Sequence, residues 1–392
     1  MQRFFLFLYA FIFIFCNDIY SQKTILKAED AIVGASRLEL YLSKLKDKNV
    51  GVIANQTSTF NETHLVDTLL SLDINIRKIF TPEHGFRGTA DEGVTINNSI
   101  DKKTNLPIIS LYGNNKKPTS SQLEDIDILL FDLQDVGTRF YTYISTMTYA
   151  MEAAAENNLP IVILDRPNPN GFYIDGPVLE KENSSFVGLH QVPVVYGLTI
   201  GEYALMVNGE YWLKDSLQCD LTVIPLGNYY RDAIYELPIK PSPNLPNWES
   251  VYLYPSLCFF EGTIISVGRG TDSPFQIYGH PMMEGDFTFI PKQAEGRNRP
   301  LLCDEECHGE YVKDYAIEYK NNKKQINLNW LINAYNQVKD KDKFFNNFFI
   351  KLSGTRDLQQ QIENGATEKE IRDSWKEGLD KYKKIRKKYL IY

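Results

Sequence analysis

The sequence predicts an α/β fold in which a doubly wound parallel sheet is covered by helices on both faces. Three observations predict it: short continuous apolar runs alternate with helical patterns in the first half, the connections between them are short, and polar residues end several of the runs. Strands that are apolar throughout are typical of parallel sheets whose two faces are both buried.

The first half contains five apolar runs that read as strands, and two stretches between them read as helices. The helical stretches are 64–72 and 141–158, the second of which carries alanines on its later turns. The predicted strands are Asn49–Asn55, Asn75–Phe80, Leu106–Gly113, Asp125–Asp135 and Leu159–Pro169.

The second half is less regular. We expect a helix over 197–213 with Thr199 near its N-terminal cap, and a strand over 220–226. The stretch 241–281 is rich in proline, glycine and aromatic residues, which predicts long ordered loops around short strands rather than regular helices.

The end of the chain reads as a helix after Asn329, a strand at 348–350 and two further helices. We place the domain boundary within 176–185. This gives an N-terminal domain of residues 23–180 and a C-terminal domain of residues 181–392.

Residues 1–22 have the features of a signal peptide. Arg3 supplies a positive charge, and the apolar run that follows it, 4–15, is too short to span a membrane, which takes about 20 residues. Cleavage is expected near Ser21 and Gln22, so the protein should be exported to the periplasm or the extracellular space. A lipoprotein anchored through Cys16 is the alternative, although Phe15 is bulkier than the residue that usually precedes such a cysteine.

The charge and the missing motifs exclude several classes of protein. The net charge of −8 argues against nucleic acid as a partner, because phosphate binding needs a basic face. The chain has no dinucleotide or phosphate-binding glycine loop, no nucleophile elbow and no H-E-x-x-H motif. We therefore expect no metal or organic cofactor, no membrane span and no nucleic acid partner, and we predict no particular protein partner.

Four cysteines follow the signal peptide, which is too few for a disulfide framework in a chain of this size. Cys303 and Cys307 are close in sequence but lack a second pair of ligands of the kind that makes a zinc motif specific. They are expected to form a local disulfide or to remain as two thiols.

Polar residues stand where four of the predicted strands end. In a parallel α/β sheet the carboxyl ends of the strands open onto one edge, and ligands bind there. These side chains are therefore expected to share one cleft: Asn55, Glu83, His84, Asp132, Gln134, Asp135, Asp165, Arg166 and Asn168.

Hydrolysis of a glycosidic bond takes a protonated acid and usually a second carboxylate. Glu83 and Glu261 are the strongest candidates, because their aromatic neighbours would favour the protonated form of a carboxyl group. Glu92 and Asp132 are further candidates. The alternative for each of them is a helix cap or a loop ion pair.

Four arginines could bind an anionic group of a substrate, because a guanidinium holds a carboxylate through two parallel hydrogen bonds. They are Arg87, Arg139, Arg166 and Arg269. The alternative is that each pairs with a neighbouring aspartate, which is most natural for Arg166 beside Asp165.

Several long motifs of the chain resemble one family, the exo-β-N-acetylmuramidases of the NamZ type. The resemblance runs in the same order from about Val50 to the C-terminus. The motifs that carry it include GVIANQTS, FTPEHGFRG, ILLFDLQDVGTRFYTYISTM, LDRPNPNG, PSPNLPN and FFEGTIISVGRGTDSPFQ.

The resemblance implies a Rossmann-like N-terminal domain without a dinucleotide, joined to a smaller C-terminal α/β domain, with the active cleft between them. It implies release of N-acetylmuramic acid from the non-reducing ends of peptidoglycan fragments, such as the disaccharide with N-acetylglucosamine and larger muropeptides. That sugar carries one carboxylate on its lactyl ether. This agrees with the separate expectation that an arginine binds an anionic group of the substrate.

By the same resemblance Glu83 is the leading catalytic acid/base, and its partner stays open among Glu92, Asp132 and Glu261. Two other functions stay open as well, a muropeptide-binding protein without catalysis and an exo-hydrolase of another N-acetylhexosaminide. The candidates for substrate binding are Asn55, His84, Arg87, Gln134, Arg139, Tyr141, Arg166, Asn168, Arg269 and Asp272.

Overall fold

The structure is a computed structural model of the whole chain, and it describes residues 25–26, 30–83, 85–86, 99–294, 298–320 and 324–392. The predicted signal peptide therefore lies outside the described residues. Within the described ranges, no helix is both long enough and apolar enough to cross a membrane.

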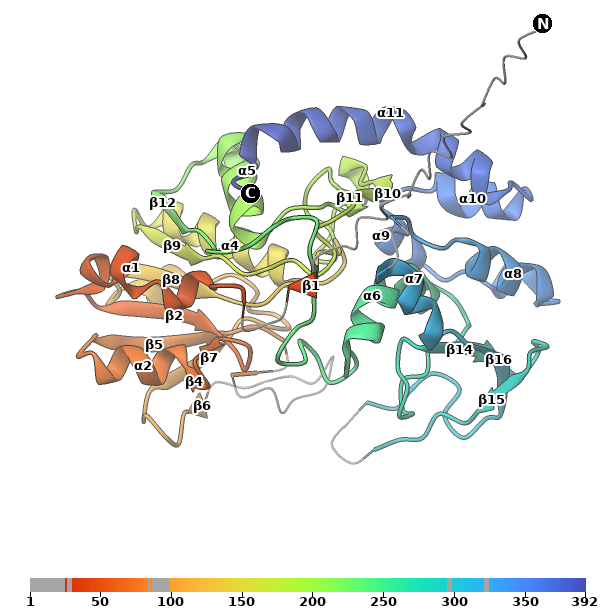
Figure 1. Cartoon of the computed structure of the whole chain (residues 1–392), viewed down its shortest axis with the longest axis horizontal. Helices are drawn as coiled ribbons and strands as arrows, with labels where there is room; N and C mark the ends of the chain where they lie inside the picture. Colours follow the sequence, from red (N-terminus) through yellow and green to blue (C-terminus); the bar gives the residue numbers. More distant parts are fainter. Residues whose placement is uncertain (1–24, 27–29, 84, 87–98, 295–297, 321–323) are drawn as a thin grey trace, which may run out of the picture.

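A seven-stranded sheet forms the N-terminal part of the molecule (Figure 1). Its order is β12-β9-β8-β2-β5-β7-β6, and every neighbouring pair is parallel except β6 with β7. The strands are β2 (Val50–Ala54), β5 (Ile76–Thr81), β6 (Ser99–Ile100), β7 (Pro107–Ser110), β8 (Ile128–Asp132), β9 (Ile161–Leu164) and β12 (Leu221–Ile224). All five strands predicted for the first half are thus confirmed. Strand β12 comes after residues 176–185 in the sequence, and the domain boundary placed there stays a prediction.

Helices cover both faces of this sheet, as the apolar strands predict. The helices are α1 (Leu38–Leu45), α2 (Leu65–Ser71), α3 (Ser120–Leu123), α4 (Tyr143–Glu156) and α5 (Ile200–Gly209). Alternate residues of one strand supply the two cores: Val52 packs with α1 and α2, whereas its neighbour Ile53 packs in the core that contains α4 and α5.

Short elements connect and flank the sheet. Thr199 caps α5 as predicted, in a reciprocal arrangement with Glu202. Three pairs of short strands are β1 (Ile25–Leu26) with β13 (Ile234–Tyr235), β3 (Thr59–Phe60) with β4 (Thr63–His64), and β10 (Asp175–Val178) with β11 (Pro193–Val195). Short 3₁₀ turns lie at 34–36, 181–183, 214–216, 258–262, 313–315, 341–343 and 387–389.

The C-terminal part is smaller and combines helices with a three-stranded antiparallel sheet of order β14-β16-β15. Its elements are α6 (Trp248–Leu257), β14 (Ile277–His280), β15 (Phe287–Phe289), β16 (Cys307–Tyr311), α7 (Ala316–Lys320), α8 (Asn329–Gln337), α9 (Phe348–Ser353), α10 (Asp357–Glu363) and α11 (Glu368–Arg386). Helix α11 runs back from this part toward α5 (Figure 1). The α/β class with a second, smaller part is confirmed, and all four cysteines of the described chain are free thiols.

The expectation that 241–281 holds no regular helix is wrong, because α6 forms there with Pro255 inside it. Asn247 caps the helix through the backbone N–H of Ser250. A proline removes the hydrogen bond to the carbonyl four residues earlier, that of Val251. Here the Nδ2 of Asn170 donates to this carbonyl at 3.3 Å, so the helix tolerates the proline.

The strand predicted at 348–350 is also wrong, because these residues begin α9. Three apolar residues are too few to show a period, so the sequence pattern cannot separate a strand from a helix. The Oδ1 of Asn346 accepts from the N–H of Phe348, and the buried Phe349 and Leu352 recur at helical spacing.

Arg139 is fully buried and joins the two parts of the molecule. Its Nη1 donates to the carbonyls of Pro177 at 2.9 Å and Val192 at 2.7 Å. Its Nη2 donates to the carbonyls of Leu352 at 2.9 Å and Ser353 at 2.7 Å, the last two residues of α9. One guanidinium therefore satisfies four backbone acceptors and holds the end of α9 against the segments around β10 and β11.

Asp135 lies at the start of the loop that leads into α4 and is also buried. The hydroxyl of Tyr196 donates to its Oδ2, and the N–H of Gly137 donates to the same oxygen at 2.6 Å. Burial raises the pKa of Asp135 to about 7, although these two donors act in the opposite direction.

Replacing Arg139 with methionine should destabilise the fold strongly, because four buried carbonyls lose this donor, although that of Val192 keeps the backbone N–H of Leu179. We expect the free energy of unfolding to fall by about 3 kcal/mol or more in denaturant titrations. Arg77→Met is the matched control, since Arg77 is about half exposed and pairs with Asp125 at the surface. That change should cost less than about 1 kcal/mol, and equal losses for the two variants would contradict the role given to Arg139.

Asp135→Asn should change how stability depends on pH. The native state holds the proton of Asp135 more tightly than the unfolded chain, so the Asp135 contribution to stability falls as pH rises from about 4 to about 7. Asparagine does not ionise, so the fall in free energy of unfolding over that range should shrink by about 2 to 4 kcal/mol. Denaturation at several pH values measures this, with the exposed Asp73→Asn as control; parallel curves for wild type and Asp135→Asn would refute it.

Candidate active site

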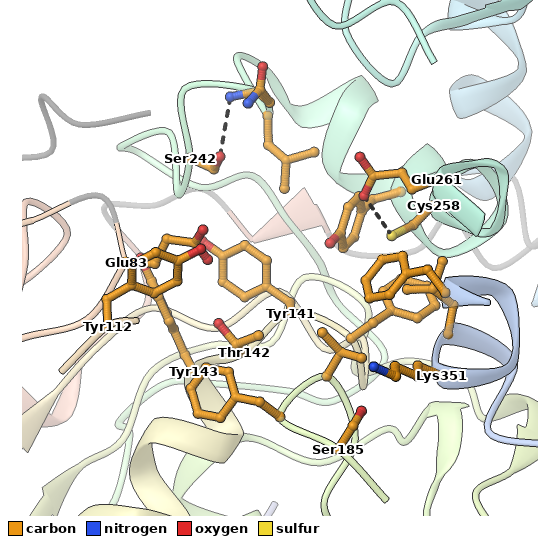
Figure 2. A pocket seen from close by; sticks show the side chains of 18 of the residues that line it. Glu83, Tyr112, Tyr141, Thr142, Tyr143, Ser185, Ser242, Cys258, Glu261 and Lys351 are labelled. Carbon is orange, nitrogen blue, oxygen red and sulfur yellow. Dashed lines mark hydrogen bonds between the residues drawn. The ribbon is translucent and has the colours of Figure 1, made fainter. Parts of the chain in front are cut away.

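A cavity of about 570 Å³ lies where the N-terminal sheet meets the C-terminal part (Figure 2). This volume is typical of small-molecule sites, which span roughly 300–1,000 Å³. Its walls are rich in aromatic rings. The residues that line it include Glu83, Tyr112, Lys116, Tyr141, Thr142, Tyr143, Ser185, Phe186, Cys258, Glu261, Arg269, Phe275 and Lys351.

Glu83 reaches the cavity from the carboxyl end of β5, in the interior of the sheet. The half-buried Glu83 follows the buried Pro82 in a turn closed by a hydrogen bond from the N–H of Gly85 to the carbonyl of Pro82. Gly85 has φ of +76°, a conformation that favours glycine. The ring of Phe86 packs edge-on against His64 at 4.7 Å, which anchors the turn.

Two tyrosines from the start of α4 stand beside Glu83 in the cavity (Figure 2). The ring centroids of Tyr141 and Tyr143 are 4.7 Å apart, and the hydroxyl of Tyr141 donates to the carbonyl of Pro241 at 2.8 Å. Burial raises the pKa of both hydroxyls, and the charge of Glu83 raises it further. Both tyrosines therefore stay protonated, and the hydroxyl of Tyr141 gives its one proton to the carbonyl of Pro241.

Asn55, a predicted substrate-binding residue, lies behind Tyr143 instead of on the cavity wall. Its Nδ2 donates to the hydroxyl oxygen of Tyr143 at 2.7 Å. Its Oδ1 accepts from the N–H of Thr57 at 2.9 Å and from the hydroxyl of Thr57 at 2.6 Å. Asn55 thus orients Tyr143 from the end of β2.

Glu261 lies on the side of the cavity opposite Glu83 (Figure 2). It forms an ion pair with Arg269. The Nε of Arg269 donates to Oε1 of Glu261 at 2.5 Å, and the thiol of Cys258 donates to Oε2 at 3.5 Å. The guanidinium of Arg269 also lies 5.0 Å from the ring centroid of Phe275. Both oxygens of Glu261 are therefore held in place.

Two lysines on the cavity wall were not predicted from the sequence. The Nζ of Lys116 lies 4.6 Å from the ring centroid of Phe186, and Lys351 projects from α9. Lys116 lies in the loop after the predicted strand Leu106–Gly113, and Lys351 directly follows the strand predicted at 348–350, but no neighbouring motif marks either as a ligand-binding group. The one available signal is that Lys351 is a single charge within an otherwise apolar stretch.

Asp132 and Arg166 form a buried ion pair outside the cavity lining. The Nε of Arg166 donates to Oδ1 of Asp132 at 2.5 Å, and its Nη2 donates to Oδ2 at 2.8 Å. Both residues are at most 5% exposed. This arrangement occupies both oxygens of the carboxylate and pairs Arg166 with Asp132, whereas Asp165 was the partner considered from the sequence.

Four further predicted binding residues also lie outside the cavity lining. The Nε2 of Gln134 donates to the carbonyls of Asp135 and Pro167, and the Nδ2 of Asn168 donates to the carbonyl of Leu198. Arg139 is engaged by the four carbonyls described above, and Asp272 is exposed outside the cavity lining.

Three predicted site residues, His84, Arg87 and Glu92, lie outside the described residues. Four others line the cavity, namely Glu83, Tyr141, Glu261 and Arg269. In the part of the chain that is described, no three histidine, cysteine, aspartate or glutamate side chains lie together as a metal ion would require.

Comparison with known proteins relates this arrangement to one family. Residues 50–249 match the family model described as exo-beta-N-acetylmuramidase NamZ, N-terminal, and residues 252–392 match the corresponding C-terminal model. The chain is 40% identical over 375 residues to peptidoglycan beta-N-acetylmuramidase NamZ of Bacillus subtilis, which covers 90% of this chain and 89% of that protein.

Two crystal structures of DUF1343 family proteins from Bacteroides fragilis share the fold. One has a TM-score of 0.86 at 45% identity and covers 92% of this chain and 99% of the other. The second has a TM-score of 0.76 at 30% identity and covers 93% and 99%. Because the two family models together span almost all of residues 50–392, the chain belongs to the NamZ family of exo-β-N-acetylmuramidases, which are glycoside hydrolases.

Proposed function

We propose that the protein releases N-acetylmuramic acid from the non-reducing ends of peptidoglycan fragments, with Glu83 as the catalytic acid/base. The observation that carries this proposal is the position of Glu83 at the carboxyl end of β5, on the wall of a cavity that holds a second carboxylate, Glu261, on its opposite side. The family membership and the curated relative support the type of bond that is cut.

In this proposal, Glu83 donates a proton to the glycosidic oxygen as the bond to the leaving sugar breaks. The second carboxylate either activates a water molecule or attacks the anomeric carbon, depending on its distance from the acid. Glu261 suits this role, because Arg269 and Cys258 orient its two oxygens. Glu92 stays a candidate for it, whereas Asp132 is occupied by Arg166 away from the cavity.

The aromatic walls supply binding energy and exclude water. Tyr112, Tyr141 and Phe275 present ring surface to the cavity, on which the apolar faces of a sugar can pack. Tyr143 adds a protonated hydroxyl group near Glu83. A hydroxyl in this position can hold a polar substituent of the sugar while Glu83 transfers its proton.

Replacing Glu83 with glutamine should remove the proton transfer and keep the shape of the site. On a chromogenic N-acetylmuramide, we expect kcat to fall about 10²- to 10⁴-fold with little change in thermal stability. Glu124→Gln is the matched control, because Glu124 is exposed outside the cavity lining. Wild-type kcat in the Glu83→Gln protein would rule out the assignment.

The same assay separates the two other functions considered for this chain. A binding protein without catalysis would hold the disaccharide of N-acetylmuramic acid and N-acetylglucosamine and release no sugar after long incubation. A hydrolase of another N-acetylhexosaminide would cleave the chromogenic N-acetylglucosaminide at least as well as the muramide.

We also propose that the protein is exported through the signal peptide at 1–22. The short apolar run after Arg3 and the action of the curated relative on peptidoglycan support this. Mass spectrometry of the protein recovered from periplasmic and medium fractions should find a mature N-terminus near Gln22. A diacylated N-terminus at Cys16 would instead show a lipoprotein, and an intact Met1 in the cytoplasm would refute export.

A further inference from the structure

Of the four arginines predicted to bind the anionic group of the substrate, Arg87 lies outside the described residues, and the other three already contact other groups of the protein. The Nη atoms of Arg139 donate hydrogen bonds to four backbone carbonyls, and Arg166 forms an ion pair with Asp132. Arg269 does reach the cavity, but there it pairs with Glu261 at 2.5 Å. Among the described residues, the other positive charges on the cavity wall belong to lysines.

These lysines are Lys116 and Lys351. The ammonium group of Lys116 lies over the ring of Phe186, which in turn stacks on Tyr149 at 5.8 Å, so Lys116 is half-buried and already has a partner. Lys351 is exposed on the cavity wall and, within the described part of the chain, takes part in no ion pair. When it binds a ligand, this cation gives up hydration and side-chain freedom, but it breaks no ion pair with another described residue.

The backbone that carries Lys351 is held rigidly. Helix α9 ends at Ser353, Gly354 follows in the left-handed conformation with φ of +75°, and Arg139 binds the last two carbonyls of the helix. The carbonyls at this helix end are therefore satisfied without Lys351. The ammonium group remains available to the cavity, which also carries the hydroxyl groups of Thr142 and Ser185.

Lys351 lies across the cavity from Glu83 (Figure 2). An anion bound at Lys351 is therefore kept away from the carboxylate that handles the glycosidic bond. N-acetylmuramic acid differs from N-acetylglucosamine by its lactyl ether, and the carboxylate of that ether is the one charge on the sugar. A lysine binds such a group as a point charge, without the fixed fork geometry of an arginine.

We propose that Lys351 binds the lactyl carboxylate of the substrate and thereby makes the site prefer N-acetylmuramic acid to N-acetylglucosamine. This inference rests on the proposed function, whose chemistry Glu83 carries out. Lys351 is assigned to specificity and takes no part in the transfer of the proton.

The test compares kcat/KM of the wild type, Lys351→Met, Lys351→Arg and Lys116→Met on the chromogenic N-acetylmuramide and N-acetylglucosaminide. For Lys351→Met we expect a loss of about 10- to 100-fold on the muramide, mainly through KM, and little change on the glucosaminide. Lys351→Arg should recover part of the loss, because it restores the charge. Lys116→Met is the matched control and should keep the wild-type ratio between the two sugars.

A muramide whose lactyl group is a methyl ester isolates the charge itself. The wild type should lose activity on the ester to the extent that Lys351→Met loses it on the acid, and Lys351→Met should treat acid and ester alike. An unchanged preference for the muramide in Lys351→Met, or its loss in Lys116→Met instead, would overturn the inference.

Calorimetric titration with the free sugars gives a second readout that does not depend on catalysis. The wild type should bind N-acetylmuramic acid more tightly than N-acetylglucosamine, and Lys351→Met should bind both with similar affinity. A wild type that cleaves no muramide but shows this binding pattern would refute the proposed function and support the role of Lys351. Equal binding of the two sugars by the wild type would refute that role.

Discussion

The buried guanidinium of Arg139 is the interaction on which the geometry of the cavity depends. Its backbone belongs to the loop that leads into α4, where Tyr141 and Tyr143 line one wall, and its Nη2 holds the end of α9, which supplies Lys351 to the same cavity. The four carbonyls that it binds are polar groups that need a hydrogen-bond partner when they are buried. Removal of the guanidinium therefore takes a donor from each of them and lowers the stability of the protein. The two walls are therefore held in register by a buried cation that lies outside the cavity lining.

The strand ends show how similar side chains take different roles. At the end of β9, Asp165 accepts hydrogen bonds from the hydroxyl of Thr199 at 2.7 Å and the N–H of Gly201 at 2.8 Å, so it binds the N-terminus of α5. At the end of β8, Asp132 is neutralised by Arg166. The end of β5 differs because the chain turns at Gly85 and leaves Glu83 half-buried beside the cavity. Of these three carboxyl groups, Glu83 alone lines the cavity, which is why it is the one proposed to transfer a proton.

Much of this structure could be predicted from the sequence, and the failures have physical causes. The apolar runs predicted the strands because a buried parallel strand is apolar on both faces, whereas α6 was missed because a side chain far along the chain, Asn170, satisfies the carbonyl that Pro255 leaves free. Four predicted residues line the cavity, but the sequence could not separate a guanidinium that binds carbonyls from one that faces a ligand. Lys351 could not be predicted, because its access to the cavity depends on a contact between α9 and Arg139, more than 200 residues away in sequence.

The charges of the cavity explain why an anionic substrate needs a cation placed apart from the catalytic acid. Its described wall carries two carboxyl groups, Glu83 (the proposed acid) and Glu261, and either of them repels an approaching lactyl carboxylate when it is ionised. The pairing of Arg269 with Glu261 offsets the charge of Glu261 on the side opposite Glu83, but it uses the charge of that arginine. A further cation is then needed on that side to attract the anionic group of the substrate. Lys351 supplies it there, so the same charge that admits the substrate also turns its anionic end away from Glu83 and leaves the glycosidic bond within reach of the acid.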